Sequence, residues 1–151
     1  MTPLADNRRS MSRTARLALL AVLALAVAGC GGDDPDPRSD KSAKGVRATA
    51  VAYVEALGEK RYDDACALLT ASARRQLTNP RAPAPCDTTL QRSLSGVGPA
   101  QLKRVKDAAA TVEVVVKGAT ARSAPISGAT RRGGRYRYLR GLWYIADAQG
   151  R

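Results

Sequence analysis

The stretch VRATAVAYVEALGEKRYDDACALLTASARRQL, residues 46–77, decides the fold of this chain. Its first half predicts an amphipathic helix over residues 44–58, because apolar side chains recur there on one helical face. These side chains are Val46, Ala50, Tyr53, Val54 and Leu57. Gly58 follows them and is typical of a helix end. The folded part of the chain is therefore expected to begin with a helix that has one apolar side.

The second half of the stretch predicts two shorter helices. Residues 62–69 carry Asp63 and Asp64 at their start, where the helix dipole favours acidic side chains. Thr70 or Ser72 can cap a third helix that ends with the quoted stretch.

Beyond a proline-rich segment, a short helix is expected over about residues 87–94, and the apolar pattern then changes to period two. The clearest alternation places Val112, Val114 and Val116 on one side of a strand. We expect strands over residues 101–107, 110–117, 119–126, 135–140 and 142–147, with a Gly/Arg loop over residues 127–134. Helices followed by an antiparallel meander indicate an α+β domain with the helices on one face of a curved sheet.

The same stretch resembles the opening of small NTF2-like (cystatin-like) domains of exported lipoproteins. In those domains a helix is followed by an acidic turn, a helix of the form AC-x-LL and an AR-x-x-L turn. The ending GLWYIADA, residues 141–148, resembles their closing strand with its tryptophan. The resemblance spans residues 46–147 and implies a cone in which N-terminal helices pack on a curved antiparallel sheet. The segment RRGGRYRYLR, residues 131–140, departs from the more acidic hairpin that usually precedes the tryptophan.

Residues 1–29 have the three-part organisation of a secretory signal peptide. An arginine-rich start is followed by the uncharged run LALLAVLALAV, residues 17–27, and then by small residues. A membrane-spanning helix needs about 20 apolar residues, so this run is short for that role. An uncleaved membrane anchor is the alternative.

The tetrapeptide Val27-Ala28-Gly29-Cys30 resembles the lipobox of bacterial lipoproteins. In that family the cysteine thiol receives a diacylglycerol and the chain is cut just before it. The resemblance implies that Cys30 carries a lipid anchor on the extracytoplasmic face of the cell membrane. Two acyl chains give a stable anchor where one gives only marginal binding. A free or disulfide-bonded Cys30 is the alternative.

The segment after the lipobox is polar. Residues 30–43, CGGDDPDPRSDKSA, consist almost entirely of Gly, Pro, Asp, Ser and basic residues and are expected to form a disordered tether. Residues 44–149 are then expected to form the NTF2-like domain.

Two cysteines remain once Cys30 is assigned to lipid. Cys66 and Cys86 form an even pair, which an exported domain favours as a disulfide, and they match a pair that such NTF2-like domains carry. Two buried free thiols are the alternative. A metal site is not expected, because the chain has no His and two thiols fall short of the four ligands of a zinc site.

The chain is strongly basic, with 25 Lys and Arg against 13 Asp and Glu. Five arginines cluster near its end and are candidates for binding anions, because guanidinium groups suit phosphate. They are Arg131, Arg132, Arg135, Arg137 and Arg140. Alternation along a strand would place Arg135 and Arg137 on one face. Anionic lipid, an envelope polymer or an envelope protein is the expected partner, and nucleic acid is not expected outside the cell. A solvated basic hairpin is the alternative.

Three tyrosines are candidates for lining a pocket inside the cone: Tyr53, Tyr136 and Tyr138. Core packing is the alternative role for them. Catalysis and cofactors are not expected, because the commonest general base, His, is absent. Acidic residues near the predicted strands are few, and Glu113 is expected to face solvent. Asp63 and Asp64 are interpreted as helix-start acids rather than as a catalytic pair.

The sequence therefore predicts a membrane-anchored lipoprotein with a non-catalytic NTF2-like domain used for binding or for protein contact. A cone that binds a small molecule or acts as an enzyme is one alternative, and a basic module on anionic lipid or wall polymer is another. A pocket lined by a buried acid and tyrosine would favour the small-molecule alternative. A cone filled by Val, Leu and Ala would favour the first hypothesis.

Overall fold

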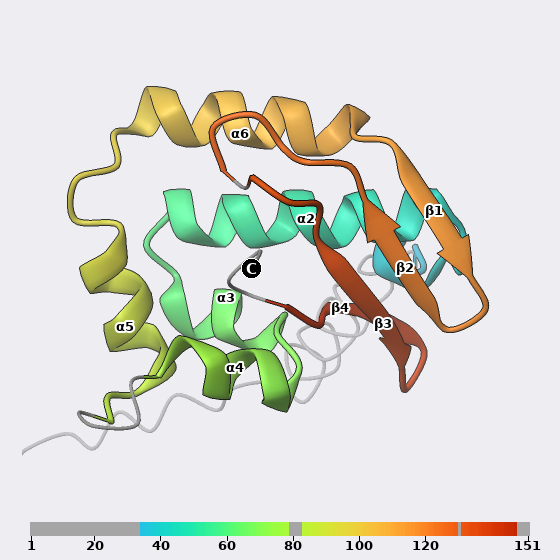
Figure 1. The fold of residues 1–151 in the computed structure, drawn as a ribbon, viewed down its shortest axis with the longest axis horizontal. Helices are drawn as coiled ribbons and strands as arrows, with labels where there is room; N and C mark the ends of the chain where they lie inside the picture. Colours follow the sequence, from blue (N-terminus) through green and yellow to red (C-terminus); the bar gives the residue numbers. More distant parts are fainter. Residues whose placement is uncertain (1–33, 79–82, 130, 148–151) are drawn as a thin grey trace, which may run out of the picture. The chain divides into compact units, whose positions relative to one another are not determined.

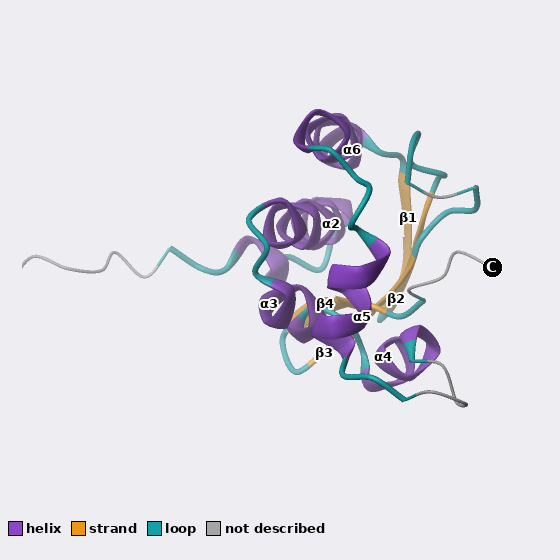
Figure 2. Ribbon diagram, turned by 90° about the vertical axis from the view of Figure 1, so that its left-hand side faces the viewer, coloured by secondary structure: helices purple, strands orange, loops and turns teal. Residues whose placement is uncertain are grey.

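The computed structural model describes residues 34–78, 83–129 and 131–147. In chain order it contains the short 3-10 helix η1 (Pro37–Ser39), α2 (Ala43–Gly58), α3 (Tyr62–Ala67), α4 (Ala71–Leu77), α5 (Cys86–Ser93), α6 (Pro99–Thr111), β1 (Val114–Lys117), β2 (Thr120–Ser123), β3 (Arg135–Leu139) and β4 (Leu142–Ile145). The strands form one antiparallel sheet in the order β1-β2-β3-β4. Helices α2 and α6 lie along one face of this curved sheet (Figure 1, Figure 2). The predicted α+β class is confirmed.

Helix α2 is the central helix and confirms the prediction for residues 44–58. It begins after Ser42, whose hydroxyl accepts a hydrogen bond from the Lys44 N–H. Its predicted apolar stripe is mostly buried, with Leu57 in the smaller core beside α3 and α5 and Tyr53 partly buried. Three residues of this stripe, Val46, Ala50 and Val54, belong to the main core cluster together with residues of α6 and of the sheet.

The prediction of a strand over residues 101–107 is wrong, because these residues lie in α6. Gly98 and Pro99 precede them, and proline at the first helical position favours a helix start. Val105 and Ala109 are spaced by four residues and are both buried, which is a helical pattern and not a period of two. Lys103 pairs with Asp107 at the same helical spacing. As a result, the first strand begins at Val114 and not at residue 110.

The predicted meander is confirmed from β1 onward. Val114 and Val116 pack on the core while Val115 and Lys117 are exposed, and Glu113 faces solvent as predicted. The two hairpins have two-residue turns, since Lys117 pairs with Thr120 and Leu139 with Leu142.

The free edge of β4 is covered by the segment that joins α3 to α4. The Thr70 N–H donates to the Ile145 carbonyl at 2.9 Å, and the Ile145 N–H donates to the Leu68 carbonyl at 3.0 Å. Thr70 is also the N-cap of α4, as the sequence suggested. Pairing or covering an edge strand removes a site of unwanted association.

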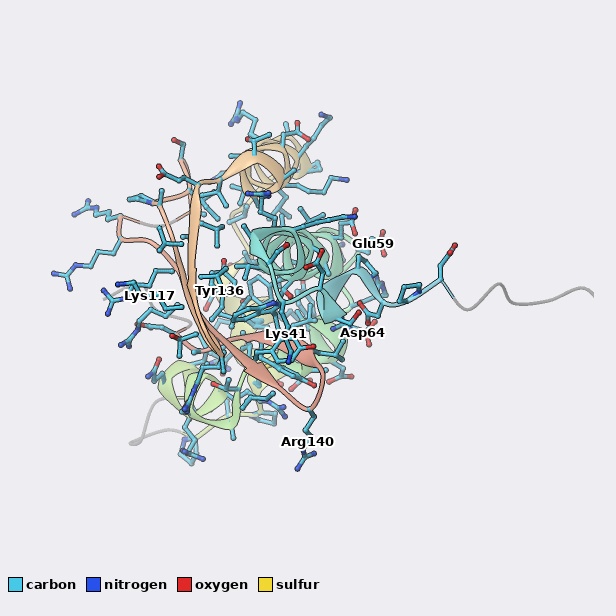
Figure 3. The ribbon with its side chains drawn as sticks, turned by 90° about the vertical axis from the view of Figure 1, so that its right-hand side faces the viewer. Lys41, Glu59, Asp64, Lys117, Tyr136 and Arg140 are labelled. Carbon is cyan, nitrogen blue, oxygen red and sulfur yellow. A yellow bond between two sulfur atoms is a disulfide. The ribbon has the colours of Figure 1, made fainter. Side chains whose placement is uncertain are left out.

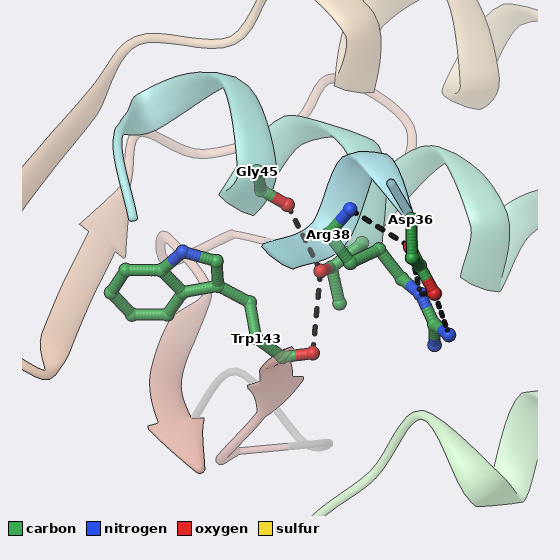
Figure 4. A network of polar contacts seen from close by, with 5 residues as sticks. Asp36, Arg38, Gly45 and Trp143 are labelled. Atoms are coloured by element: carbon green, nitrogen blue, oxygen red, sulfur yellow. Dashed lines mark hydrogen bonds and ion pairs between the residues drawn. The ribbon is translucent and has the colours of Figure 1, made fainter. Parts of the chain in front are cut away.

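Residues before α2 are held against the domain. The indole N–H of Trp143 donates to the Asp40 carbonyl at 2.8 Å, and the Tyr138 hydroxyl donates to the Ser39 carbonyl at 2.8 Å. The Thr49 hydroxyl bonds the carbonyls of Gly45 and Trp143, and Figure 4 shows this network beside η1.

The prediction that all of residues 30–43 form a disordered tether is therefore corrected for its second half. Residues 36–42 pack on α2 and β4, because the buried Trp143 and Tyr138 need backbone acceptors that this segment provides. Polar composition alone does not reveal such a role. Residues 1–29, which are predicted to be a signal peptide, and Cys30 lie outside the described residues.

Cys66 of α3 and Cys86 of α5 form the predicted disulfide. The two cysteines are 20 residues apart, and closing a loop of that length stabilises the fold by about 3 kcal/mol in the chain-entropy model. Leu90 of α5 and Ala65 of α3 pack beside the disulfide in a second small core. None of the described helices combines the length and apolar content that crossing a bilayer requires.

The turn between β3 and β4 offers a test of the fold. Arg140 and Gly141 both have positive φ, at 52° and 86°, which defines the kind of hairpin turn that Asn-Gly satisfies best. Arg140→Asn is expected to raise the free energy of unfolding by about 0.5–1 kcal/mol, because Asn tolerates the left-handed region better than Arg. Urea unfolding would measure it. A loss of stability in this variant would contradict the described turn.

Candidate functional site

A cavity of about 310 Å³ lies between α2, α6 and the sheet. It is more enclosed than the larger hollow beside η1 on the other side of α2. Most of its wall is apolar. Representative apolar lining residues are Ala50, Val54, Leu57, Leu102, Val105 and Ile126. Small-molecule sites are typically clefts of about 300–1,000 Å³ with apolar walls and a few polar groups, and this cavity is at the lower end of that range.

Two of the predicted pocket tyrosines contribute to this cavity. Tyr53 reaches it from α2 and Tyr136 from the inner face of β3, and Figure 3 shows Tyr136 between the sheet and the helices. Burial raises the pKa of Tyr53 to about 12. Burial also raises the pKa of Tyr136, and a hydrogen bond with Ser123 partly offsets this effect. Both hydroxyls are therefore protonated at neutral pH and act as neutral hydrogen-bonding groups.

A buried acid lines the same cavity. Asp147 follows β4, and its side chain is only 10% exposed. The Arg135 guanidinium donates to it with Nη2 at 2.8 Å and Nε at 3.2 Å. Gln101 of α6 is a further polar lining residue. The cavity thus combines an apolar wall with two tyrosines, an amide and an acid that an arginine neutralises.

Asp147 was not among the predicted site residues. It lies two residues beyond the end of β4, where it meets both the cavity and the outward-facing Arg135. Gln101 was not predicted either, because its segment was expected to be a strand.

Tyr138 lies outside the cavity, so its assignment to the pocket is corrected. It shares the inner face of β3 with Tyr136 but stands two residues further along, which is about 7 Å. There its ring meets the edge of Trp143 at a centroid distance of 5.3 Å, and Lys41 lies over it at 5.1 Å. Its role is to hold the segment before α2.

The structure separates the predicted arginine cluster. Arg135 and Arg137 lie on the outer face of β3, as predicted, and Arg132 lies beside Arg135 at a shared surface hollow. Arg131 is exposed in the preceding loop. Arg140 stands in the turn between β3 and β4, beyond the end of the strand (Figure 3).

An arginine outside the predicted cluster belongs to the same outer face. Arg122 of β2 pairs in register with Arg135. Arg122 was not predicted, because the sequence does not give the register between the two strands.

Within the described residues, no group of three or more His, Cys, Asp or Glu side chains is placed to hold a metal ion. Comparison of the chain with protein families, with curated proteins and with solved structures gives no match. The proposals below therefore rest on the residues and geometry of this chain.

The raised pKa of Tyr53 predicts a specific alkaline behaviour. An unfolded tyrosine titrates near pH 10, so between pH 10 and about 12 the folded state keeps a proton that the unfolded state loses. The free energy of unfolding should therefore be unaffected by this group below pH 10 and should fall as the pH rises above it. Tyr53→Phe is expected to make this fall shallower by up to about 1.4 kcal/mol per pH unit.

Urea unfolding at several alkaline pH values would measure the slope, with Tyr62→Phe as the control on a neighbouring helix. Equal slopes in the wild-type protein and in Tyr53→Phe would contradict the buried position of the Tyr53 hydroxyl.

Proposed function

We propose that this protein is a lipid-anchored extracytoplasmic lipoprotein whose NTF2-like domain binds a small, mainly apolar molecule in the cavity between α2, α6 and the sheet. The observation that carries the proposal is the convergence of Tyr53, Tyr136 and Asp147 on one apolar cavity.

The lining of the cavity supports a ligand-binding role for the cone over a purely structural role. A cone without a ligand site would be expected to fill its interior with Val, Leu and Ala. Here the space is open, and the polar groups on its wall can orient a ligand that carries a hydroxyl, carbonyl or amine. Burial of apolar area supplies the affinity and these few polar groups supply the selectivity.

Binding is favoured over catalysis by the state of the polar groups. Tyr53 and Tyr136 are protonated at neutral pH, as tyrosines ordinarily are, and burial raises the pKa of both still further from neutrality. The Asp147 carboxylate already accepts two hydrogen bonds from Arg135. These groups can hold a substrate-sized molecule, and the proposal assigns them no proton-transfer step.

The anchor and the fold family rest on sequence features and on compatible structural ones. The lipobox-like Val27-Ala28-Gly29-Cys30 supports a lipid anchor at Cys30. The disulfide between Cys66 and Cys86 is compatible with an exported domain. Helices that precede a curved antiparallel meander, with a buried Trp143 in the last strand, support the NTF2-like assignment.

A cavity-filling substitution tests the ligand site. Leu102 lines the cavity from α6, and Leu102→Trp is expected to weaken binding of a neutral apolar fluorophore, N-phenyl-1-naphthylamine, at least tenfold by occupying the space. Leu139→Trp is the matched control, because Leu139 is 41% exposed on the outer face of the sheet. It should leave the dissociation constant within about twofold of wild type.

Fluorescence titration of the purified proteins measures the dissociation constant of the fluorophore for both variants. If Leu102→Trp bound the fluorophore as tightly as wild type, or if the wild-type protein did not bind it, the cavity would not be the ligand site.

A second substitution tests the anchor independently of the cavity. Cys30→Ala is expected to move the protein from the membrane fraction to the soluble fraction or to block processing, because the lipid-accepting thiol is lost. Fractionation of intact cells with mass spectrometry of the mature N-terminus would measure this. Processing at residue 30 together with retention on membranes in Cys30→Ala would contradict the lipid anchor.

A further inference from the structure

The outer face of the sheet brings together arginines that repel one another. Arg122 of β2 and Arg135 of β3 are directly opposite in the antiparallel register, and both are exposed. Opposite residues on such strands have Cβ atoms about 4.5–5.5 Å apart, and like charges in that position are destabilising. Folding alone gives no reason to place two guanidinium groups there.

Other cations extend the same face. Arg137 follows Arg135 at the next outward position of β3 and pairs in register with Thr120, while Lys117 of β1 is exposed beside Thr120. Figure 3 shows Lys117 on the side of the sheet away from the helices. Arg122, Arg135 and Arg137 border a shallow hollow of about 460 Å³, which Ser72 of α4 also lines.

The charge of this face is only partly neutralised by the protein. Asp147 pairs with Arg135. Arg122 and Arg137 make no ion pair or side-chain hydrogen bond with any residue in the described part of the chain. An external anion would relieve the repulsion between the opposed arginines and satisfy their free donors.

We infer that this outer arginine face, defined as Arg122, Arg135 and Arg137, binds the phosphate groups of a linear anionic phosphodiester polymer. Guanidinium groups bind phosphate through paired N–H donors. Arg135 and Arg137 are two residues apart on one strand, a separation of about 7 Å, and Arg122 stands across the strand pair. Successive phosphates of a polymer can engage all three guanidinium groups without drawing them together.

The direction in which the outer arginine face points favours a polymer over the bilayer as the source of the bound phosphates. Near the start of the described chain, η1 packs on α2 and β4, and Figure 2 shows this segment on the side of the domain opposite β1 and β2. With residues 36–42 held on the domain, six residues at most, 30–35, separate Cys30 from the fold. Such a segment spans at most about 20 Å. An anchor on so short a segment would hold the start of the fold near the bilayer and leave the outer arginine face for a polymer, and this choice of partner rests on the proposed anchor.

The test uses the purified mature protein in neutral detergent and an end-labelled linear polyphosphate as the polymer probe. Fluorescence anisotropy gives the affinity at several salt concentrations. The double variant Arg122→Gln/Arg137→Gln is expected to weaken polyphosphate binding at least tenfold at low salt. It should also reduce the slope of log affinity against log salt by about 1.5–2, because two phosphate contacts are lost. Removing the like-charge contact should leave the unfolding temperature equal to or above that of wild type.

The control variant Arg92→Gln/Arg104→Gln removes the same charge from α5 and α6 and should change the affinity by less than threefold. Equal losses in the two double variants would show attraction to net charge only and would overturn the inference.

Competition distinguishes the sources of phosphate. Inorganic phosphate should compete only at far higher phosphate concentration than unlabelled polyphosphate. Phosphatidylglycerol mixed into the detergent micelles should leave polyphosphate binding unchanged. Displacement by phosphatidylglycerol would identify a membrane surface as the ligand and would overturn the proposed polymer. The cavity is not probed by this experiment, so its outcome is independent of the proposed small-molecule site.

Discussion

The hydrogen bond from the Trp143 indole to the Asp40 carbonyl is the contact on which the arrangement of this domain depends. The chain has no Phe and one Trp, so this fully buried ring supplies a large share of the core volume. A buried indole N–H needs an acceptor, and here a backbone carbonyl outside the regular elements provides it. Gly45 permits this approach, because a Cβ at that position would lie 2.0 Å from the Asp40 oxygen. Thr49 then links α2 to the carbonyl of Trp143 itself.

The packing around Trp143 determines where the cavity lies. Strand β4 runs from the contact of Trp143 with the segment before α2 to Ile145 at the cavity, and Asp147 follows it there. The neighbouring strand β3 runs antiparallel to it. Tyr136 of β3 lines the cavity, and Tyr138 contacts the Trp143 ring. The two inward-facing tyrosines of one strand therefore have different roles, because a step of two residues moves the side chain from a filled region to an open one.

The fold could be predicted from the sequence wherever one local pattern dominated. The apolar stripe of α2, the Thr70 cap and the valine alternation of β1 were such patterns, and all three were confirmed. Helix α6 was missed, because its apolar residues are few and mostly alanine, so the Gly98-Pro99 start was a better guide than periodicity. The ordered segment before α2 was missed because its backbone, and not its side chains, makes the decisive contacts.

The candidate sites were predictable to a smaller degree. Tyr53 and Tyr136 were identified by residue type, but the distinction between Tyr136 and Tyr138 depends on how far the core extends along β3. Arg122 joins Arg135 only through strand register, which a sequence does not specify without the turn lengths and bulges between strands. The two proposed sites therefore depend on two consequences of tertiary structure: an unfilled interior region and an outward row of guanidinium groups.

The most direct test of this account is the free energy of unfolding of Trp143→Phe, measured in urea. The smaller ring cannot donate to the Asp40 carbonyl and leaves unfilled space at a fully buried site. We expect a loss of about 2–3 kcal/mol, because an unsatisfied buried group and lost core volume both contribute. A change of less than about 0.5 kcal/mol, well below the usual cost of such core changes, would show that the segment before α2 and the sheet are held together by other contacts and would contradict the account.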